Sequence, residues 1–404
     1  MSPTPARAAP ANHQLVIALS VTQLVAWGSC YYAYAVLMEP IQAALGISKS
    51  TAAGAYSLGL LVMGFAAIPV GMLIDRGRHF RVLIGGTVMT MIGLLLHAAI
   101  NQIWQLYAVW ALIGAGMAGT LYESVFAFLI RAYPDDYRRR ITFVTLLGGL
   151  ASTVFWPLTT LLLATFGWRG ALVGLAVLQL FGCLLCHFFT LPRQLPPRPH
   201  ASDHETNQDT RRATFKEMLQ SRPFVLLTIS FTLQSIVFAG LTAHIIGLLS
   251  ALGVGAAIGL IAAASVGVMQ VLSRVLLLTV DSKFHHATIA NFVTWLMPAA
   301  AITLLLLGIS PWLVFLYALL FGAGNGMMTI VKGTATADLI SKERVAMLNG
   351  VMAPPLAIAR AIGPVLVATL WDYFGSPHAA VVAIVLLASA GAIALMGAYR
   401  AAGR

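Results

Sequence analysis

Four charged side chains lie inside long apolar stretches of the sequence: Glu123, Arg274, Lys332 and Arg360. An arginine at the centre of a membrane helix costs about 2.5–3.5 kcal/mol on insertion scales, so it normally faces a cavity, a partner or a ligand. Two guanidinium groups that share a cavity repel each other when it is empty, and an anion neutralises them. Arg274 and Arg360 are therefore candidate anion-binding residues. The structural alternatives are an ion pair or, for Arg274, a side chain that reaches the membrane surface.

Other polar side chains in these stretches could complete such a site. Glu123 could pair with a basic group or carry a proton. His244 could titrate near neutrality, as histidine does, or be a satisfied histidine near a helix end. Lys332, near the expected end of its helix, is interpreted as a gate or an interfacial anchor. The candidate hydrogen-bonding residues for a ligand are Tyr31, Tyr32, Gln234, Gln270 and Asn325.

The composition identifies the environment of these residues. The chain has 404 residues, of which 59% are hydrophobic and 9% are charged. A soluble globular protein carries about 25% charged residues, which it needs to cover its surface. A water-soluble enzyme, a nucleic-acid-binding protein and a disordered protein are all disfavoured, and we expect an integral membrane protein.

The apolar residues form twelve runs, each long enough to cross a bilayer as a helix of about 20 residues. This pattern predicts an all-α membrane protein with twelve transmembrane helices. The runs are 14–37, 51–74, 82–100, 104–132, 141–164, 171–190, 223–249, 254–280, 287–307, 311–332, 345–370 and 378–398.

The basic residues predict the orientation of these helices. Of 24 Lys and Arg residues, 19 fall at the two termini or in the loops after helices 2, 4, 6, 8 and 10. Cytoplasmic loops of membrane proteins are enriched in Lys and Arg. We therefore expect a multi-pass protein of the inner (plasma) membrane with both termini in the cytoplasm. The net charge of +11 reports this topology and does not indicate a nucleic-acid partner.

A segment rich in proline and charge, 191–222, separates six helices from six. Such a composition is typical of a linker. We expect an N-terminal six-helix bundle over 1–190, a cytoplasmic linker over 191–222 and a C-terminal six-helix bundle over 223–404.

Two short matches relate the halves. Gly-Ala-Gly occurs at 114–116 and 322–324, and Phe-Gly occurs at 166–167 and 374–375, in both cases 208 positions apart. The common offset indicates a duplicated, pseudo-symmetric pair of bundles. A duplicated bundle with a cavity between its halves is the architecture of a secondary transporter.

The loop after the second expected helix contains Gly71, Asp75, Arg76, Gly77 and Arg78. It resembles the signature loop of the major facilitator superfamily, although the family usually places its second glycine one position later. The resemblance implies a conformational switch: Gly71 permits close helix packing, and Asp75 pairs with a basic side chain or a helix N-terminus of the other half. The alternative is an ordinary basic cytoplasmic loop.

Within that superfamily the chain resembles the monocarboxylate-transporter-like bacterial permeases, including the oxalate/formate exchanger and the YcxA-like group. The resemblance implies that Arg274 binds a substrate carboxylate and that Arg360 is a second cationic site. Gln270 stands where monocarboxylate carriers keep a proton-coupling aspartate, which argues against proton symport. The matching stretches are 27–32, 120–123, 155–157, 269–274, 324–334 and 359–361.

These observations predict a secondary active transporter, without enzymatic activity, cofactor or metal. It would move a small organic anion, most simply a carboxylate, by alternating access, as proton symport or anion exchange. We expect a monomer in the lipid bilayer with no nucleic-acid partner. The alternatives are an efflux permease for a hydrophobic drug or metabolite, and a sensor or non-transporting scaffold.

Overall fold

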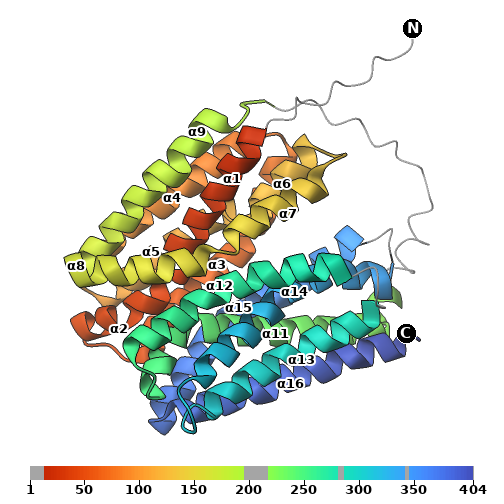
Figure 1. Cartoon of the computed structure of the whole chain (residues 1–404). Helices are drawn as coiled ribbons and strands as arrows, with labels where there is room; N and C mark the ends of the chain where they lie inside the picture. Colours follow the sequence, from red (N-terminus) through yellow and green to blue (C-terminus); the bar gives the residue numbers. More distant parts are fainter. Residues whose placement is uncertain (1–12, 195–216, 281–285, 342–344, 404) are drawn as a thin grey trace.

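The computed structural model describes residues 13–194, 217–280, 286–341 and 345–403 (Figure 1). Every regular element within these ranges is helical. The first half contains α1 (His13–Ala26), the π-helix η1 (Trp27–Tyr32), α2 (Tyr34–Leu45), α3 (Lys49–Asp75), α4 (His79–Ala98), α5 (Ile103–Thr120), α6 (Tyr122–Ala132), α7 (Tyr137–Gly148), α8 (Ala151–Gln179), the π-helix η2 (Leu180–Leu185) and α9 (Cys186–Thr190). The second half contains α11 (Arg222–Ala251), α12 (Ala256–Val280), α13 (His286–Leu305), α14 (Leu313–Leu339), α15 (Val345–Phe374) and α16 (Pro377–Ala401).

Within the described residues, eleven continuous helical segments are long and apolar enough to cross a membrane. The longest, Tyr137–Thr190, contains two passes, because Gly167 has φ 66° and ψ 177° and breaks the helix. Figure 1 shows the chain turning back within α8. The twelve helices expected from hydropathy are thereby confirmed.

Two predicted helix ends are wrong. The first helix was expected to end at residue 37 but continues, with its π-helical turn, to Leu45. The tenth was expected to end at Lys332 but continues to Leu339. Hydropathy reports where a helix leaves apolar surroundings, whereas backbone hydrogen bonding continues through polar residues.

The matched glycines pack equivalent helices in the two halves. A Cβ on Gly114 of α5 would lie 2.1 Å from the Gly59 carbonyl oxygen of α3, and one on Gly322 of α14 would lie 2.6 Å from the Val266 carbonyl oxygen of α12. In each half, the fourth transmembrane helix therefore packs so closely on the second that their backbones are in contact. The repeat seen in the sequence is a repeat of packing.

The second sequence match marks equivalent turns. Gly167 and Gly375, each after a phenylalanine, have φ values of 66° and 63°. A residue with a Cβ is disfavoured in this left-handed region, so glycine suits both turns.

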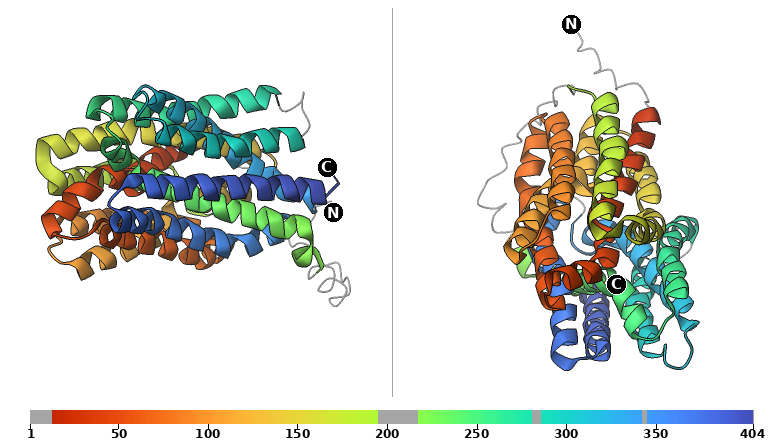
Figure 2. Two further views of the ribbon diagram at one scale, coloured as in Figure 1. Left: turned by 90° about the horizontal axis from the view of Figure 1, so that it is seen from below. Right: turned by 90° about the vertical axis from the view of Figure 1, so that its left-hand side faces the viewer.

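The two halves lie side by side (Figure 1). In particular, α15 contacts α3, and α12 contacts α8. Figure 2 shows α16 beside α11 within the second half. Most of the predicted linker, 195–216, lies outside the described residues.

Candidate functional site

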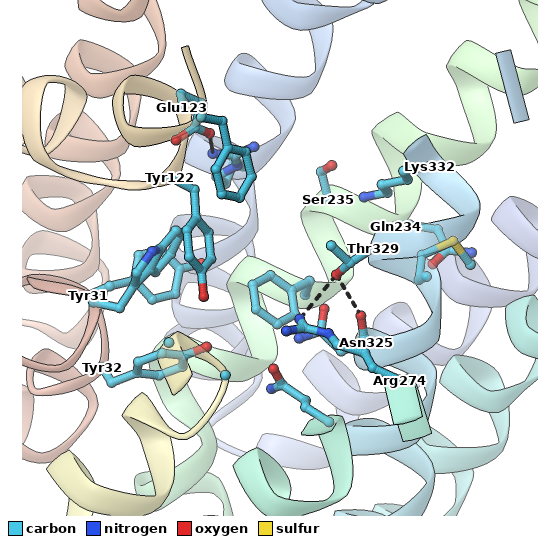
Figure 3. A pocket seen from close by; sticks show the side chains of 18 of the residues that line it. Tyr31, Tyr32, Tyr122, Glu123, Gln234, Ser235, Arg274, Asn325, Thr329 and Lys332 are labelled. Carbon is cyan, nitrogen blue, oxygen red and sulfur yellow. Dashed lines mark hydrogen bonds and ion pairs between the residues drawn. The ribbon is translucent and has the colours of Figure 1, made fainter. Parts of the chain in front are cut away.

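A cavity of about 260 Å³ lies between the two halves (Figure 3). The first half contributes a surface that we call the aromatic wall, together with Glu123. The aromatic wall consists of Trp27, Tyr31, Tyr32, Tyr122 and Phe126. The second half contributes a surface that we call the cationic wall. It consists of Gln234, Gln270, Arg274, Asn325, Lys332 and Arg360.

Arg274 extends from α12 of the second half to the first half. Its side chain is 7% exposed. Nη1 donates to the Thr145 carbonyl oxygen of α7 at 2.7 Å, and Nε donates to the Gly326 carbonyl oxygen at 3.3 Å. Nη2 donates to Thr329 Oγ1 at 3.4 Å. Within the described residues these neutral acceptors occupy three of the five guanidinium N–H donors, and no carboxylate neutralises the charge. The group can therefore accept an anion.

The glycine pair at the junction of α7 and α8 makes room for two lining side chains. A Cβ on Gly149 would lie 3.2 Å from Arg274 Nη1. A Cβ on Gly148 would lie 2.2 Å from the Tyr122 hydroxyl oxygen. Larger residues here would displace both side chains from the cavity surface.

Arg360 is paired across the interface between the halves. Its Nη1 lies 3.5 Å from Glu123 Oε1, with the two side chains 27% and 51% exposed. The pair links α15 to α6. Of the alternatives open for Glu123, the structure contains the ion pair, and Arg360 is neutralised in this conformation.

A break in the fourth transmembrane segment directs Tyr122 and Glu123 into the cavity. Leu121 has an extended backbone (ψ −173°) between α5 and α6. Two carbonyl oxygens near the break find side-chain donors: Ser124 Oγ donates to Ala118 O at 2.6 Å, and Gln23 Nε2 donates to Thr120 O at 2.8 Å. Because these bonds satisfy buried polar groups, they stabilise the interruption.

A π-helical turn places the other aromatic residues. Trp27–Tyr32 forms η1, in which the Ala33 amide donates to the Gly28 carbonyl oxygen at 2.9 Å. Such turns widen the helix and are frequent at functional sites. This turn allows the consecutive residues Tyr31 and Tyr32 to line the same cavity.

Several lining polar atoms have no protein partner among the described residues. They are Trp27 Nε1, Tyr31 Oη, Gln234 Oε1 and Gln270 Nε2. Gln234 Nε2 is satisfied, since it donates to Thr294 Oγ1 at 2.6 Å. Buried polar groups in proteins are usually paired, so unpaired ones at a cavity are candidate ligand contacts.

Lys332 lies about two turns before the end of α14 and lines the cavity. Its Nζ is 5.6 Å from the centre of the Phe231 ring, and no carboxylate pairs with it within the described ranges. Asn325 lines the cavity from the same helix, and its carbonyl oxygen accepts from Thr329 Oγ1 at 3.0 Å.

His244 lies outside this cavity. It is buried, and its ring Nε2 lies 2.8 Å from the Pro364 carbonyl oxygen. We call the face where α1 begins and α16 ends the terminal face. His244 lies toward the opposite face. Among the described residues, no three His, Cys, Asp or Glu side chains are grouped to hold a metal ion.

At the opposite face the halves are linked directly. The Ser50 amide, in the first turn of α3, donates to Asp372 Oδ2 of α15 at 2.8 Å. Lys49 Nζ lies 3.5 Å from the centre of the Trp371 ring. A carboxylate at a helix N-terminus and a cation over an indole are both favourable contacts.

The loop between α3 and α4 lies at the terminal face, with Asp75, Arg76 and Arg78 exposed. Arg131 of α6 donates to the Asp75 carbonyl oxygen, which ties the loop to its own half. In this conformation no helix packs closely against Gly71, because a Cβ there would meet no atom within 4 Å; its role in a switch stays a prediction. Glycine is needed instead at Gly77, where φ is 82°.

The structure thus brings together Tyr31, Tyr32, Glu123, Gln234, Gln270, Arg274, Asn325, Lys332 and Arg360 from the predicted set. It adds Trp27, Tyr122, Phe126, Phe238 and Thr329. Trp27 and Tyr122 stand beside residues that the sequence did single out. Aromatic residues are common in any membrane core, so only their position at a cavity distinguishes these.

Taken together, the twelve helices in two related halves and the charged cavity between them define a membrane transporter. The profile of the Major Facilitator Superfamily matches residues 19–297, and the chain belongs to this family.

Two curated relatives match parts of the chain. Monocarboxylate transporter 11 of Homo sapiens is 34% identical over 143 residues, which are 34% of this chain and 29% of that protein. Monocarboxylate transporter 13 of Bos taurus is 30% identical over 198 residues, which are 47% of this chain and 43% of that protein. The matched region spans less than half the length of either relative.

Solved structures share the fold along nearly the whole chain. A mutant of the nucleoside transporter NupG has a TM-score of 0.74 at 15% identity, covering 96% of this chain and 99% of that one. A POT family transporter in complex with 5-aminolevulinic acid has a TM-score of 0.71 at 16% identity, covering 95% and 94%. A bacterial homolog of the lysosomal transporter Spinster, inward-facing and occupied, has a TM-score of 0.68 at 17% identity, covering 98% and 96%.

Proposed function

We propose that the protein is a secondary active transporter of a small organic anion, and that the anion's carboxylate binds Arg274. The observation that carries this proposal is the buried guanidinium at the cavity, whose charge no carboxylate neutralises within the described residues. A carboxylate can use the two N–H donors that these residues leave over, and such charge-assisted bonds are strong. The partial matches to monocarboxylate transporters support the same substrate class.

Arg360 and Glu123 would couple binding to movement of the halves. Their ion pair crosses the interface that must open and close during alternating access. An anion that reaches Arg360 competes with Glu123, and a proton on Glu123 releases Arg360. The first case gives anion exchange and the second gives proton symport.

The conformation described here would be open toward the terminal face. The Ser50–Asp372 and Lys49–Trp371 contacts hold the halves together at the opposite face. If the basic loops mark the cytoplasm of the inner membrane, this is an inward-open state. A reporter enzyme that is active only outside the cytoplasm, fused after residue 403, should remain inactive. An active fusion would reverse the assignment.

The test is counterflow into proteoliposomes across a panel of mono- and dicarboxylates, with and without a pH gradient. At least one carboxylate should exchange, and Arg274→Gln should lower its uptake about tenfold or more, since a charged hydrogen bond is removed. Arg169→Gln is the matched control, because Arg169 bonds the Ile100 carbonyl oxygen and Asn101 away from the cavity. Counterflow of no carboxylate would refute the proposal.

The alternative is efflux of a hydrophobic drug or metabolite, which the aromatic wall favours. In that case the arginines are structural. Transport of an uncharged aromatic compound would then continue in Arg274→Gln and Arg360→Gln at normal protein levels.

A further inference from the structure

The aromatic wall forms one continuous surface. Trp27 lies 5.0 Å from Tyr31 and 5.0 Å from Tyr122, measured between ring centres. Tyr122 in turn stacks on Phe126 at 5.1 Å. From the second half, Phe238 stacks on Tyr31 at 6.3 Å, so the rings reach across the interface.

These rings are not simply part of the packed interior. Trp27, Tyr122, Phe126 and Phe238 are only half-buried, and all of them line the cavity. An exposed apolar surface of this kind is stabilised when a ligand with an apolar face covers it.

Two polar atoms on the same wall also lack protein partners among the described residues, namely Trp27 Nε1 and Tyr31 Oη. Tyr31 is 2% exposed. Tyrosine and tryptophan usually find a hydrogen-bond partner when buried. In contrast, Trp156 on the far side of η1 donates to the Tyr32 carbonyl oxygen at 3.0 Å, as a structural tryptophan does.

Arg274 and the aromatic wall belong to opposite sides of one small cavity (Figure 3). A ligand that fits both has a carboxylate at one end and a flat body that lies against rings. Ring–ring contacts add a factor of about 2 to 12 in affinity beyond what area burial provides. A ligand with a saturated body of equal size makes no ring–ring contacts and therefore lacks this gain in affinity.

We propose that the preferred substrate is an aromatic carboxylate, whose carboxylate binds Arg274 while its ring contacts Trp27 and Tyr122. This inference rests on the proposed function and names the substrate class of the same site. The cavity, of about 260 Å³, is large enough for one ring with a short side chain.

The experiment compares three competitors in the wild-type counterflow assay: phenylacetate, cyclohexylacetate and propionate. Phenylacetate should inhibit about tenfold more tightly than cyclohexylacetate, whose ring is of similar size but is puckered and has no π system. Trp27→Leu and, separately, Tyr122→Leu should reduce this ratio to about threefold or less. The control is Trp104→Leu, since Trp104 is 65% exposed and outside the cavity.

Each outcome has a distinct meaning. Equal inhibition by phenylacetate and cyclohexylacetate, with transport intact, overturns the aromatic preference and leaves anion transport standing. An unchanged ratio in both leucine variants also overturns it, because the wall then does not contact the ligand. Absence of transport for every carboxylate refutes the proposed function itself. The wild-type comparison needs no variant, so a folding failure of one variant does not decide the result.

Discussion

In the first half of the chain Gly114 lets α5 approach α3, and in the second half Gly322 lets α14 approach α12. The turns at Gly167 and Gly375 correspond in the same way. The cavity does not share this correspondence. Among the described residues that line it, the three cations come from the second half and the one carboxylate comes from the first half.

This difference shows that two properties of a duplicated transporter are constrained separately. Backbone contacts between helices depend on small residues at crossing points, and both halves need them to form a bundle. Side chains at the cavity depend on the ligand, and the proposed ligand is not symmetric. An anion with an apolar body requires a cationic surface on one side and an apolar surface on the other.

The largest expected effect tests the shared packing. Gly114→Ala and Gly322→Ala should each lower stability by about 1–3 kcal/mol, because each Cβ would overlap a backbone carbonyl oxygen that cannot easily move. The measurement is the apparent melting temperature in detergent. Gly85→Ala and Gly333→Ala are matched controls, since a Cβ at either site meets no atom within 4 Å. If either Gly114→Ala or Gly322→Ala leaves the melting temperature unchanged, the two halves are not packed alike.

An intermediate effect tests the charge asymmetry. Arg360→Gln leaves the Glu123 carboxylate unpaired in the proposed anion-binding cavity, and should raise KM about tenfold, roughly 1.4 kcal/mol. Glu123→Gln should lower KM or leave it unchanged. The KM of the double variant, Arg360→Gln with Glu123→Gln, should lie within about threefold of the wild-type KM, because both charges of the pair are gone.

That comparison also locates the substrate. If the double variant is as impaired as Arg360→Gln alone, Arg360 contacts the anion directly and does more than balance Glu123. KM measured in proteoliposomes with equal amounts of inserted protein distinguishes the two cases.

The smallest expected effect concerns Lys332. Lys332→Gln should raise KM about two- to threefold at low salt, and less at 0.5 M salt, since ions screen a charge on a wet cavity surface. Lys332→Arg keeps the charge and should resemble wild type. A loss as large as that of Arg274→Gln would make Lys332 a direct ligand and would place the anion nearer the terminal face.

The sequence by itself determined the solvent and the number of passes, because both follow from the amount and spacing of apolar residues. It also identified the cations of the site, since a charge in an apolar stretch is conspicuous without any tertiary structure. His244 shows the limit of that reasoning, because a histidine in an apolar helix looks the same whether it bonds a carbonyl oxygen or lines a cavity.

Only the tertiary structure decided which of these groups meet. The pairing of Glu123 with Arg360 joins residues 237 positions apart in the sequence through a helix break at Leu121. The aromatic wall likewise depends on the π-helical turn at Trp27–Tyr32, which changes the direction of consecutive side chains. Hydropathy is a local property of the chain, whereas a cavity is formed by helices from both halves. Its chemistry therefore depends on how those helices cross.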